Sequence, residues 1–80
     1  MKRGDVVISR RGSDAGRAYV VLETSGENYV LVSDGRRHKL SGPKKKNVKH
    51  VSPAGASVEI PASDAELARI IESLNLSEKP

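Results

Sequence analysis

The chain has 80 residues, with 14 Lys and Arg, ten Asp and Glu, and no cysteine. This length allows one small domain with a limited core, and the lack of cysteine excludes disulfides, a thiol nucleophile and a cysteine-based zinc site. Residues 1–52 carry 12 basic and five acidic side chains, a net charge of +7, whereas residues 53–80 carry two and five, a net charge of −3. This asymmetry indicates a polyanion-binding front part followed by a segment with another role.

The first two predicted strands frame a short basic loop. Asp5–Ser9 and Ala18–Thr24 are rich in β-branched and apolar residues, which suit a pleated, half-buried surface. Gly12 and Gly16 stand between them, where the backbone must turn. The unit therefore combines a core-facing apolar set with a cationic loop at residues 10–17.

The stretch from Gly4 to Leu22 resembles the KOW motif of ribosomal proteins and transcription elongation factors. A Gly-Asp opener, an alternating apolar strand, two glycines framing the turn, a base and then Tyr-Val-Val-Leu carry the resemblance. Within that class the chain is similar to a small group of bacterial KOW-domain RNA-binding proteins, themselves similar to KOW-type large-subunit ribosomal proteins of archaea and eukaryotes. The resemblance covers residues 1–52. It implies an SH3-like barrel, RNA binding in translation, and structural roles for Gly4, Gly12 and Gly16.

The chain departs from the KOW pattern at one place. Many KOW motifs have a further glycine shortly after the second one, whereas Ala18 and Tyr19 occupy that region here. We therefore expect a loop that is tighter than, or shaped differently from, the loop of those motifs.

The next segments predict an antiparallel meander. Asn28–Ser33 is apolar at both parities, which indicates a strand covered on both faces. The Asp-Gly pair that follows is a strong hairpin signal and predicts a fourth strand at Arg36–Leu40. Lys44–Asn47 is expected to be a charged connector, and Val48–Val51 is a candidate closing strand. We predict a mainly β fold, a small SH3-like antiparallel barrel of about five strands plus one C-terminal α-helix.

The C-terminal third contains one predicted helix. After a barrel at residues 1–52, we expect a linker or short extended segment at 53–62 and an amphipathic helix at 63–76. Ser63 and Glu66 stand at capping-box spacing, and the helix is predicted to end at Asn75 or Ser77.

An apolar stripe runs along this predicted helix, at Leu67, Ile70, Ile71 and Leu74. A helix of about a dozen residues is marginal in water by itself, so the stripe must be buried. Two hypotheses follow: the stripe packs on the barrel, or it docks on a partner or on a second copy of the chain.

Basic side chains gather in three segments of residues 1–52, and such a surface attracts phosphates with a steep dependence on salt. Arginine suits bidentate phosphate contacts better than lysine, so we expect the arginines to position RNA and the lysine run at 44–46 to act as a flexible electrostatic clamp. Residues 43–50, PKKKNVKH, resemble a signature of the small bacterial group. The candidate RNA-binding residues are Arg10, Arg11, Arg17, Arg36, Arg37, Lys39, Lys44, Lys45, Lys46, Lys49 and His50.

Aromatic residues are scarce, because only Tyr19 and Tyr29 are present. Modules that recognise single-stranded RNA usually offer several stacking rings, and we expect both tyrosines to pack in the core or to be half-buried. The pattern favours structured RNA, recognised through shape, phosphates and 2′-hydroxyls. The only predicted helix is acidic, so the chain has no basic recognition helix for duplex DNA.

Other kinds of site find little support in the sequence. His38 and His50 are twelve positions apart with no further His or Cys, which predicts no metal site. No serine has an evident base and orienting partner, and no phosphate-binding glycine-rich loop is present, so we expect neither an enzyme nor a cofactor or small-molecule substrate. The apolar run Val6–Ile8 is too short for a signal peptide or membrane span, which predicts a cytoplasmic protein with no membrane partner.

Taken together, the sequence predicts non-catalytic binding of structured RNA, with ribosomal RNA as the expected ligand in the ribosome and translation. The alternative is a protein-interaction module, in which the SH3-like barrel or the C-terminal helix docks a ribosomal, transcription or translation partner.

Overall fold

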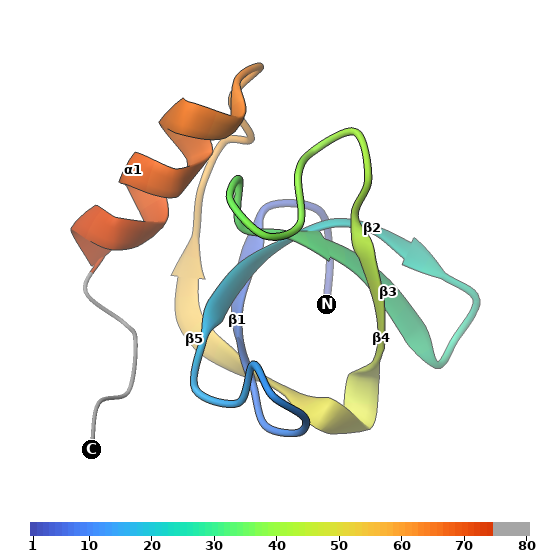
Figure 1. The fold of residues 1–80 in the computed structure, drawn as a ribbon. Helices are drawn as coiled ribbons and strands as arrows, with labels where there is room; N and C mark the ends of the chain where they lie inside the picture. Colours follow the sequence, from blue (N-terminus) through green and yellow to red (C-terminus); the bar gives the residue numbers. More distant parts are fainter. Residues whose placement is uncertain (75–80) are drawn as a thin grey trace.

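The computed structural model of the chain describes residues 1–74, which form a mainly β fold with one C-terminal helix (Figure 1). Five strands and one α-helix confirm the predicted class, a small SH3-like barrel followed by a helix. The elements in chain order are β1 (Asp5–Ser9), β2 (Ala18–Ser25), β3 (Tyr29–Ser33), β4 (Lys44–Asn47), the 3-10 helix η1 (Val48–His50), β5 (Val51–Ser57) and α1 (Asp64–Leu74).

All five strands belong to one antiparallel sheet, in the order β4-β3-β2-β1-β5. The chain runs through β1, β2, β3 and β4 as neighbouring strands, and β5 then returns to pair with the free side of β1. The sheet curls round on itself in Figure 1. Within residues 1–74, β4 and β5 are therefore the two edges of the sheet, and η1 connects them.

Two apolar clusters lie on opposite faces of the curled sheet, because successive side chains of a strand point to opposite faces. The cluster inside the curl contains Val7, Tyr19, Val21, Val30, Val32 and Val51. The outer cluster contains Val6, Ile8, Ala18, Val20 and Leu67, and the last of these comes from α1. The helix thus covers the outer face of β1 and β2, which explains why these strands are apolar at both parities.

The start and the apolar stripe of α1 follow the sequence prediction. The Ser63 hydroxyl accepts a hydrogen bond from the Glu66 backbone N–H at 3.1 Å, which caps the helix. Leu67 is fully buried, and Ile71 and Leu74 pack against the outer cluster. The stripe therefore packs on the barrel of the same chain. The predicted helix end at Asn75 or Ser77 lies outside the described residues.

The predicted strand at Arg36–Leu40 is wrong, because local hydrogen bonds hold this segment in a compact loop. The Asp34 carboxylate accepts hydrogen bonds from the backbone N–H groups of Arg36 and His38, at 2.9 and 3.0 Å. The Ser33 hydroxyl donates to the His38 carbonyl at 2.6 Å. Short polar side chains that bond nearby backbone groups offer the chain an alternative to a strand ladder.

The expected connector at Lys44–Asn47 is also wrong, because these residues form β4. Lys44 lies opposite Val32, and Lys46 lies opposite Val30, in register with β3. Charged residues have low strand propensity, but an edge strand takes its shape from the neighbour with which it pairs.

The closing strand begins later and extends further than predicted. The candidate strand Val48–Val51 is mostly η1, which Asn47 caps by accepting a hydrogen bond from the Lys49 N–H at 2.9 Å. The closing strand is β5, which crosses the predicted boundary at residue 52 and includes residues 53–57 of the expected linker. An edge strand tolerates Pro53, which lacks an N–H group, because one side of the strand has no partner.

Candidate nucleic-acid interface

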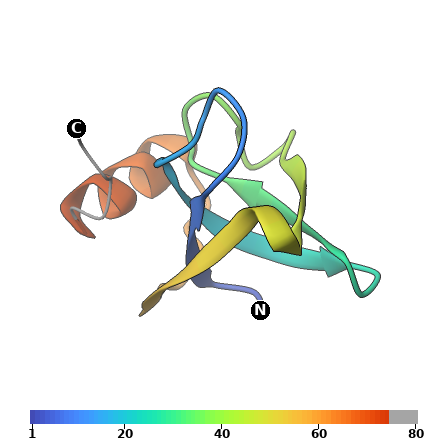
Figure 2. The ribbon, with the colours of Figure 1, turned by 90° about the horizontal axis from the view of Figure 1, so that it is seen from below.

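Two loops rich in basic residues lie at the same end of the barrel. The first basic loop, residues 10–17, joins β1 to β2, and the second basic loop, residues 34–43, joins β3 to β4. Alternate turns of an antiparallel meander fall at the same end, whereas the β2–β3 turn falls at the other. Figure 2 shows the blue and green loops together at one end, away from the N-terminus. The strand order thus brings together two basic segments that are separated in the sequence.

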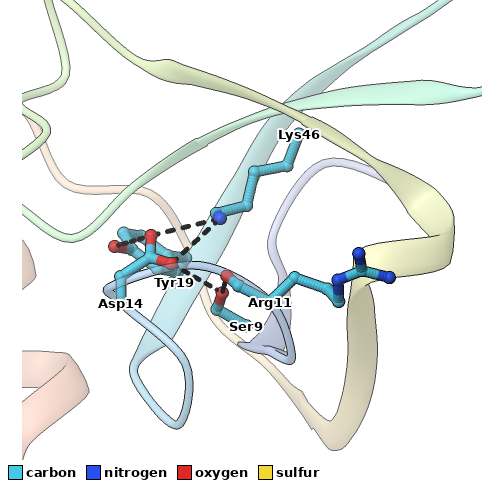
Figure 3. A network of polar contacts seen from close by, with 5 residues as sticks. All are labelled: Ser9, Arg11, Asp14, Tyr19 and Lys46. Carbon is cyan, nitrogen blue, oxygen red and sulfur yellow. Dashed lines mark hydrogen bonds and ion pairs between the residues drawn. The ribbon is translucent and has the colours of Figure 1, made fainter.

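A buried carboxylate anchors the first basic loop. Asp14 has a side chain that is only 9% exposed. One of its oxygens accepts a hydrogen bond from the Ser9 hydroxyl at 2.9 Å, and the other accepts one from the Tyr19 hydroxyl at 2.8 Å. The Lys46 ammonium lies 3.1 Å from both oxygens (Figure 3). This network ties the loop to β1, β2 and β4.

The network shifts the pKa values of Asp14 and Tyr19. Burial alone would raise the pKa of Asp14, but hydrogen bonds from Tyr19, Ser9 and Lys46, with the charge of Lys46, outweigh it and lower the pKa from 3.8 to about 2. The pKa of Tyr19 is raised, first by burial and then by its hydrogen bond to the carboxylate. At neutral pH, Asp14 and Lys46 therefore form an ion pair without net charge.

The second basic loop is anchored from outside the barrel, by α1. The Leu40 backbone N–H donates a hydrogen bond to the Asp64 carboxylate at 2.7 Å. Gly35 has a φ of +76°, and a Cβ atom there would collide with the Asp64 carbonyl oxygen and lie 2.9 Å from the Ala68 nitrogen. The loop approaches the first turns of α1 so closely that only glycine fits.

The three consecutive lysines of β4 have three different environments. Lys44 and Lys46 point to one side of the strand, whereas Lys45 points to the other. Lys46 reaches Asp14 and is 9% exposed, whereas the Lys45 ammonium lies 4.7 Å from the centre of the Tyr29 ring. The three lysines thus belong to a paired strand and do not share one environment, since Lys46 is held by Asp14 whereas Lys44 and Lys45 are exposed.

A pocket of about 300 Å³ lies between the two basic loops and β4. Its only acidic residue, Asp14, is neutralised by Lys46, so the remaining charges make the pocket positive. Arg11 contributes to the lining, although its guanidinium group points away from Asp14 in Figure 3. The lining residues are Arg11, Gly12, Ser13, Asp14, Arg37, His38, Lys44 and Lys46.

Other predicted residues lie beside α1 rather than in this pocket. Arg17 and Arg36 line a second depression, together with Asp34 and Glu72. Arg36 forms an ion pair with Glu72 on the surface, where the two side chains are 62% and 68% exposed. The two carboxylates make this depression less positive than the pocket between the loops.

The remaining predicted residues are distributed around the barrel. The Arg10 side chain donates a hydrogen bond to the Ser52 hydroxyl at 2.8 Å, and its backbone N–H donates to the His50 carbonyl at 2.8 Å. Lys49 is exposed on η1, and Lys39 is exposed in the second basic loop. Positive φ angles occur at all three predicted motif glycines, Gly4, Gly12 and Gly16.

Sequence reasoning missed two features of this surface. Asp14 was not among the predicted site residues, yet it is the centre of the buried network; the available signal was a lone acid within a basic loop. Tyr29 was expected in the core or half-buried, but it is 40% exposed. Its place at the first position of β3, directly after the turn, was the available signal for exposure.

No helix within residues 1–74 is both long and apolar enough to cross a membrane. Nor do His, Asp and Glu side chains in that range form a group of three that could hold a metal ion.

Comparison with known proteins identifies the family. No protein-family model matches the chain. However, it is 38% identical over 79 residues to the large ribosomal subunit protein eL14 of Pyrobaculum arsenaticum, and the match covers 94% of this chain and 75% of the relative. The chain belongs to the eL14 family of large ribosomal subunit proteins. The eL14 protein of Staphylothermus marinus is 34% identical and that of Sulfolobus acidocaldarius 30%, each over 94% of this chain and 80% of the relative.

The eL14 relationship confirms the resemblance to archaeal large-subunit ribosomal proteins and extends it. The resemblance was assigned to residues 1–52, whereas the eL14 match covers 94% of the chain. The barrel and α1 therefore belong to one eL14-like unit.

Proposed function

We propose that this protein binds structured RNA of the large ribosomal subunit, without catalysis. The observation that carries the proposal is the meeting of Arg11, Arg37 and Lys44, from three separate segments, around one pocket. Their convergence gives the end of the barrel a positive charge that the neutral Asp14–Lys46 pair does not offset. Such a surface suits a phosphate backbone. Membership of the eL14 family makes ribosomal RNA the expected ligand.

The distribution of aromatic residues supports structured RNA over an extended single strand. Tyr19 is buried, and Tyr29 is the only aromatic ring exposed within residues 1–74. A platform that reads successive unpaired bases needs several rings. We therefore infer recognition through phosphates, 2′-hydroxyls and shape, by the set of basic residues that the sequence predicts.

Two further assignments, the cellular location and the bacterial group, are part of the same proposal. We infer a cytoplasmic site of action, because the relatives are proteins of the large ribosomal subunit. We also retain the proposal that the chain represents a small bacterial group within the KOW class, which rests on the run of residues 43–50. Neither assignment requires a cofactor or a catalytic residue.

Docking of a ribosomal or translation protein by α1 is the weaker alternative. Leu67 and Ala68 are buried, and Ile71 and Leu74 pack against the outer cluster of the barrel. The apolar stripe is thus used within the molecule, so a protein partner would have to contact the polar side of the helix.

In-cell crosslinking of the tagged protein to RNA, followed by sequencing, tests the proposal. We expect reads concentrated on one structured region of large-subunit ribosomal RNA, and we expect fewer such reads in each of two single variants, Arg37→Gln and Lys44→Gln, which lose one positive charge each. Arg69→Gln, on exposed α1, is the matched control for the loss of one positive charge. Reads scattered over messenger RNAs, or none above background, would contradict the proposal.

A further inference from the structure

We propose that the pocket between the two basic loops is the seat of one backbone phosphate of the bound RNA, held by Arg37 and Lys44. The inference rests on the proposed RNA-binding function and assigns a place and a chemical group to it. Residues of both basic loops and of β4 line this pocket together. A phosphate bound in the pocket would contact all three segments at once.

The two cations are available for a ligand. Arg37 and Lys44 both line the pocket, and both are exposed. Within residues 1–74, neither side chain forms an ion pair or a hydrogen bond. Arg36, their neighbour in the second basic loop, is by contrast paired with Glu72. An arginine and a lysine together provide a directional fork and a point charge for one phosphate group.

The backbone of the first basic loop adds uncharged donors. Gly12 and Ser13 line the same pocket, and Gly12 has a φ of +87°. Among the described residues, the backbone N–H groups of these two residues donate no hydrogen bond. Consecutive N–H groups beside a residue with positive φ form concave sites that favour anions.

The buried ion pair explains how a carboxylate can line a phosphate site. An unpaired Asp14 would repel a phosphate, but its two oxygens are occupied by Ser9, Tyr19 and Lys46. Lys46 therefore screens the carboxylate, while Lys44 remains free to bind. The volume of about 300 Å³ leaves room for one phosphate group.

The first test compares single and double variants in binding to a stem–loop RNA, measured by fluorescence anisotropy at several salt concentrations. Arg37→Gln and Lys44→Gln are each expected to weaken binding about tenfold and to lower the slope of log K against log salt by about one. Because both side chains hold the same phosphate, the double variant should lose less than the product of the single effects. Lys45→Gln, on the opposite face of β4, should weaken binding less than Lys44→Gln.

The second test measures amide NMR shifts on addition of inorganic phosphate, with the ionic strength matched by chloride. It tests the phosphate pocket separately from the proposed RNA-binding function. We expect phosphate-specific shifts confined to residues 12, 13 and 44, which disappear in the double variant. Shifts spread evenly over all basic segments would overturn the pocket. If they are confined to the pocket but the stem–loop RNA does not bind, the RNA function fails and the anion site stands. If RNA binds and Lys44→Gln matches Arg69→Gln, the pocket fails and the RNA function stands.

Discussion

The two basic loops carry similar charges and face the same end of the barrel, yet different parts of the molecule hold them. The first is anchored from within, by the hydrogen bonds and ion pair of Asp14. The second is anchored from outside, through Leu40 and Gly35 against α1. The C-terminal helix therefore contributes to the interface by holding the second basic loop, even though its first turn is acidic. The helix positions the second basic loop, and the barrel core positions the first.

The largest loss of stability is expected from removing Asp14, the inner anchor of the first basic loop. Asp14→Ala leaves the Lys46 ammonium buried without its carboxylate and removes the acceptors of Ser9 and Tyr19. Breaking a buried ion pair from one side costs about 3–5 kcal/mol, so thermal unfolding should occur at least about 12 °C lower. Lys39→Ala, an exposed residue of the second basic loop, is the control. A loss below about 1 kcal/mol would show that the network does not hold the first loop.

The second-largest loss of stability is expected from a substitution that pushes the second basic loop away from α1. Gly35→Ala places a methyl group against backbone atoms of Asp64 and Ala68, which have no freedom to rotate aside. We expect a loss of about 3 kcal/mol in the free energy of unfolding, from the positive φ and the collision together. Gly26→Ala is a matched control, because Gly26 has a φ of +70° and open space around it. Equal losses from both substitutions would contradict a close contact between loop and helix.

Acid should weaken the inner anchor of the first basic loop. The pKa of Asp14 is lowered to about 2 in the folded protein from 3.8, so its contribution is complete above about pH 5 and is lost as the pH falls through 2. A difference of nearly two pH units corresponds to about 2 kcal/mol. The gap in unfolding free energy between the wild type and Asp14→Asn should therefore narrow by about this amount between pH 5 and pH 2. A gap that stays constant would contradict the lowered pKa.

The smallest loss of unfolding free energy is expected from removing the exposed ion pair between the second basic loop and α1. Glu72→Gln removes the exposed ion pair with Arg36, and such pairs contribute at most about 1 kcal/mol in water. The change in unfolding free energy should vanish at high salt, because exposed charges are screened. A larger loss that persists at high salt would show that this pair, rather than Gly35 and Leu40, holds the loop to α1.

The strands that the sequence predicts correctly are those whose own side chains favour a sheet. β1, β2 and β3 are rich in valine, isoleucine, tyrosine and leucine, and turn residues lie between them, so local preference and final structure agree. β4 and β5 have no such signal, since they read KKKN and VSPAGAS. Their strand geometry comes from pairing with β3 and β1, which lie far away in the sequence, and a local pattern cannot contain that information.

The candidate site, like the fold, has a part that the sequence predicts and a part that it does not. The basic residues are visible in the sequence, and their enrichment in residues 1–52 predicts a polyanion-binding surface. Which of them are free and which are paired depends on contacts across the barrel, such as Lys46 with Asp14, 32 positions away. Identical neighbours therefore acquire different roles: Lys44 lines the pocket, Lys45 covers Tyr29 and Lys46 is buried. Only the register of β4 against β3 decides between them.

The two edges of the sheet also bear on self-association. A strand with an unpaired side is a template for pairing with another molecule, which leads to aggregation. On one edge, β4 carries three lysines in four residues, which repel a second copy of themselves; on the other, β5 contains Pro53, which lacks the N–H group that intermolecular pairing needs. Part of the charge that we propose for RNA thus also disfavours pairing between the sheet edges of two free molecules. Neutralising β4 to weaken RNA binding would at the same time expose the chain to aggregation before it reaches its RNA.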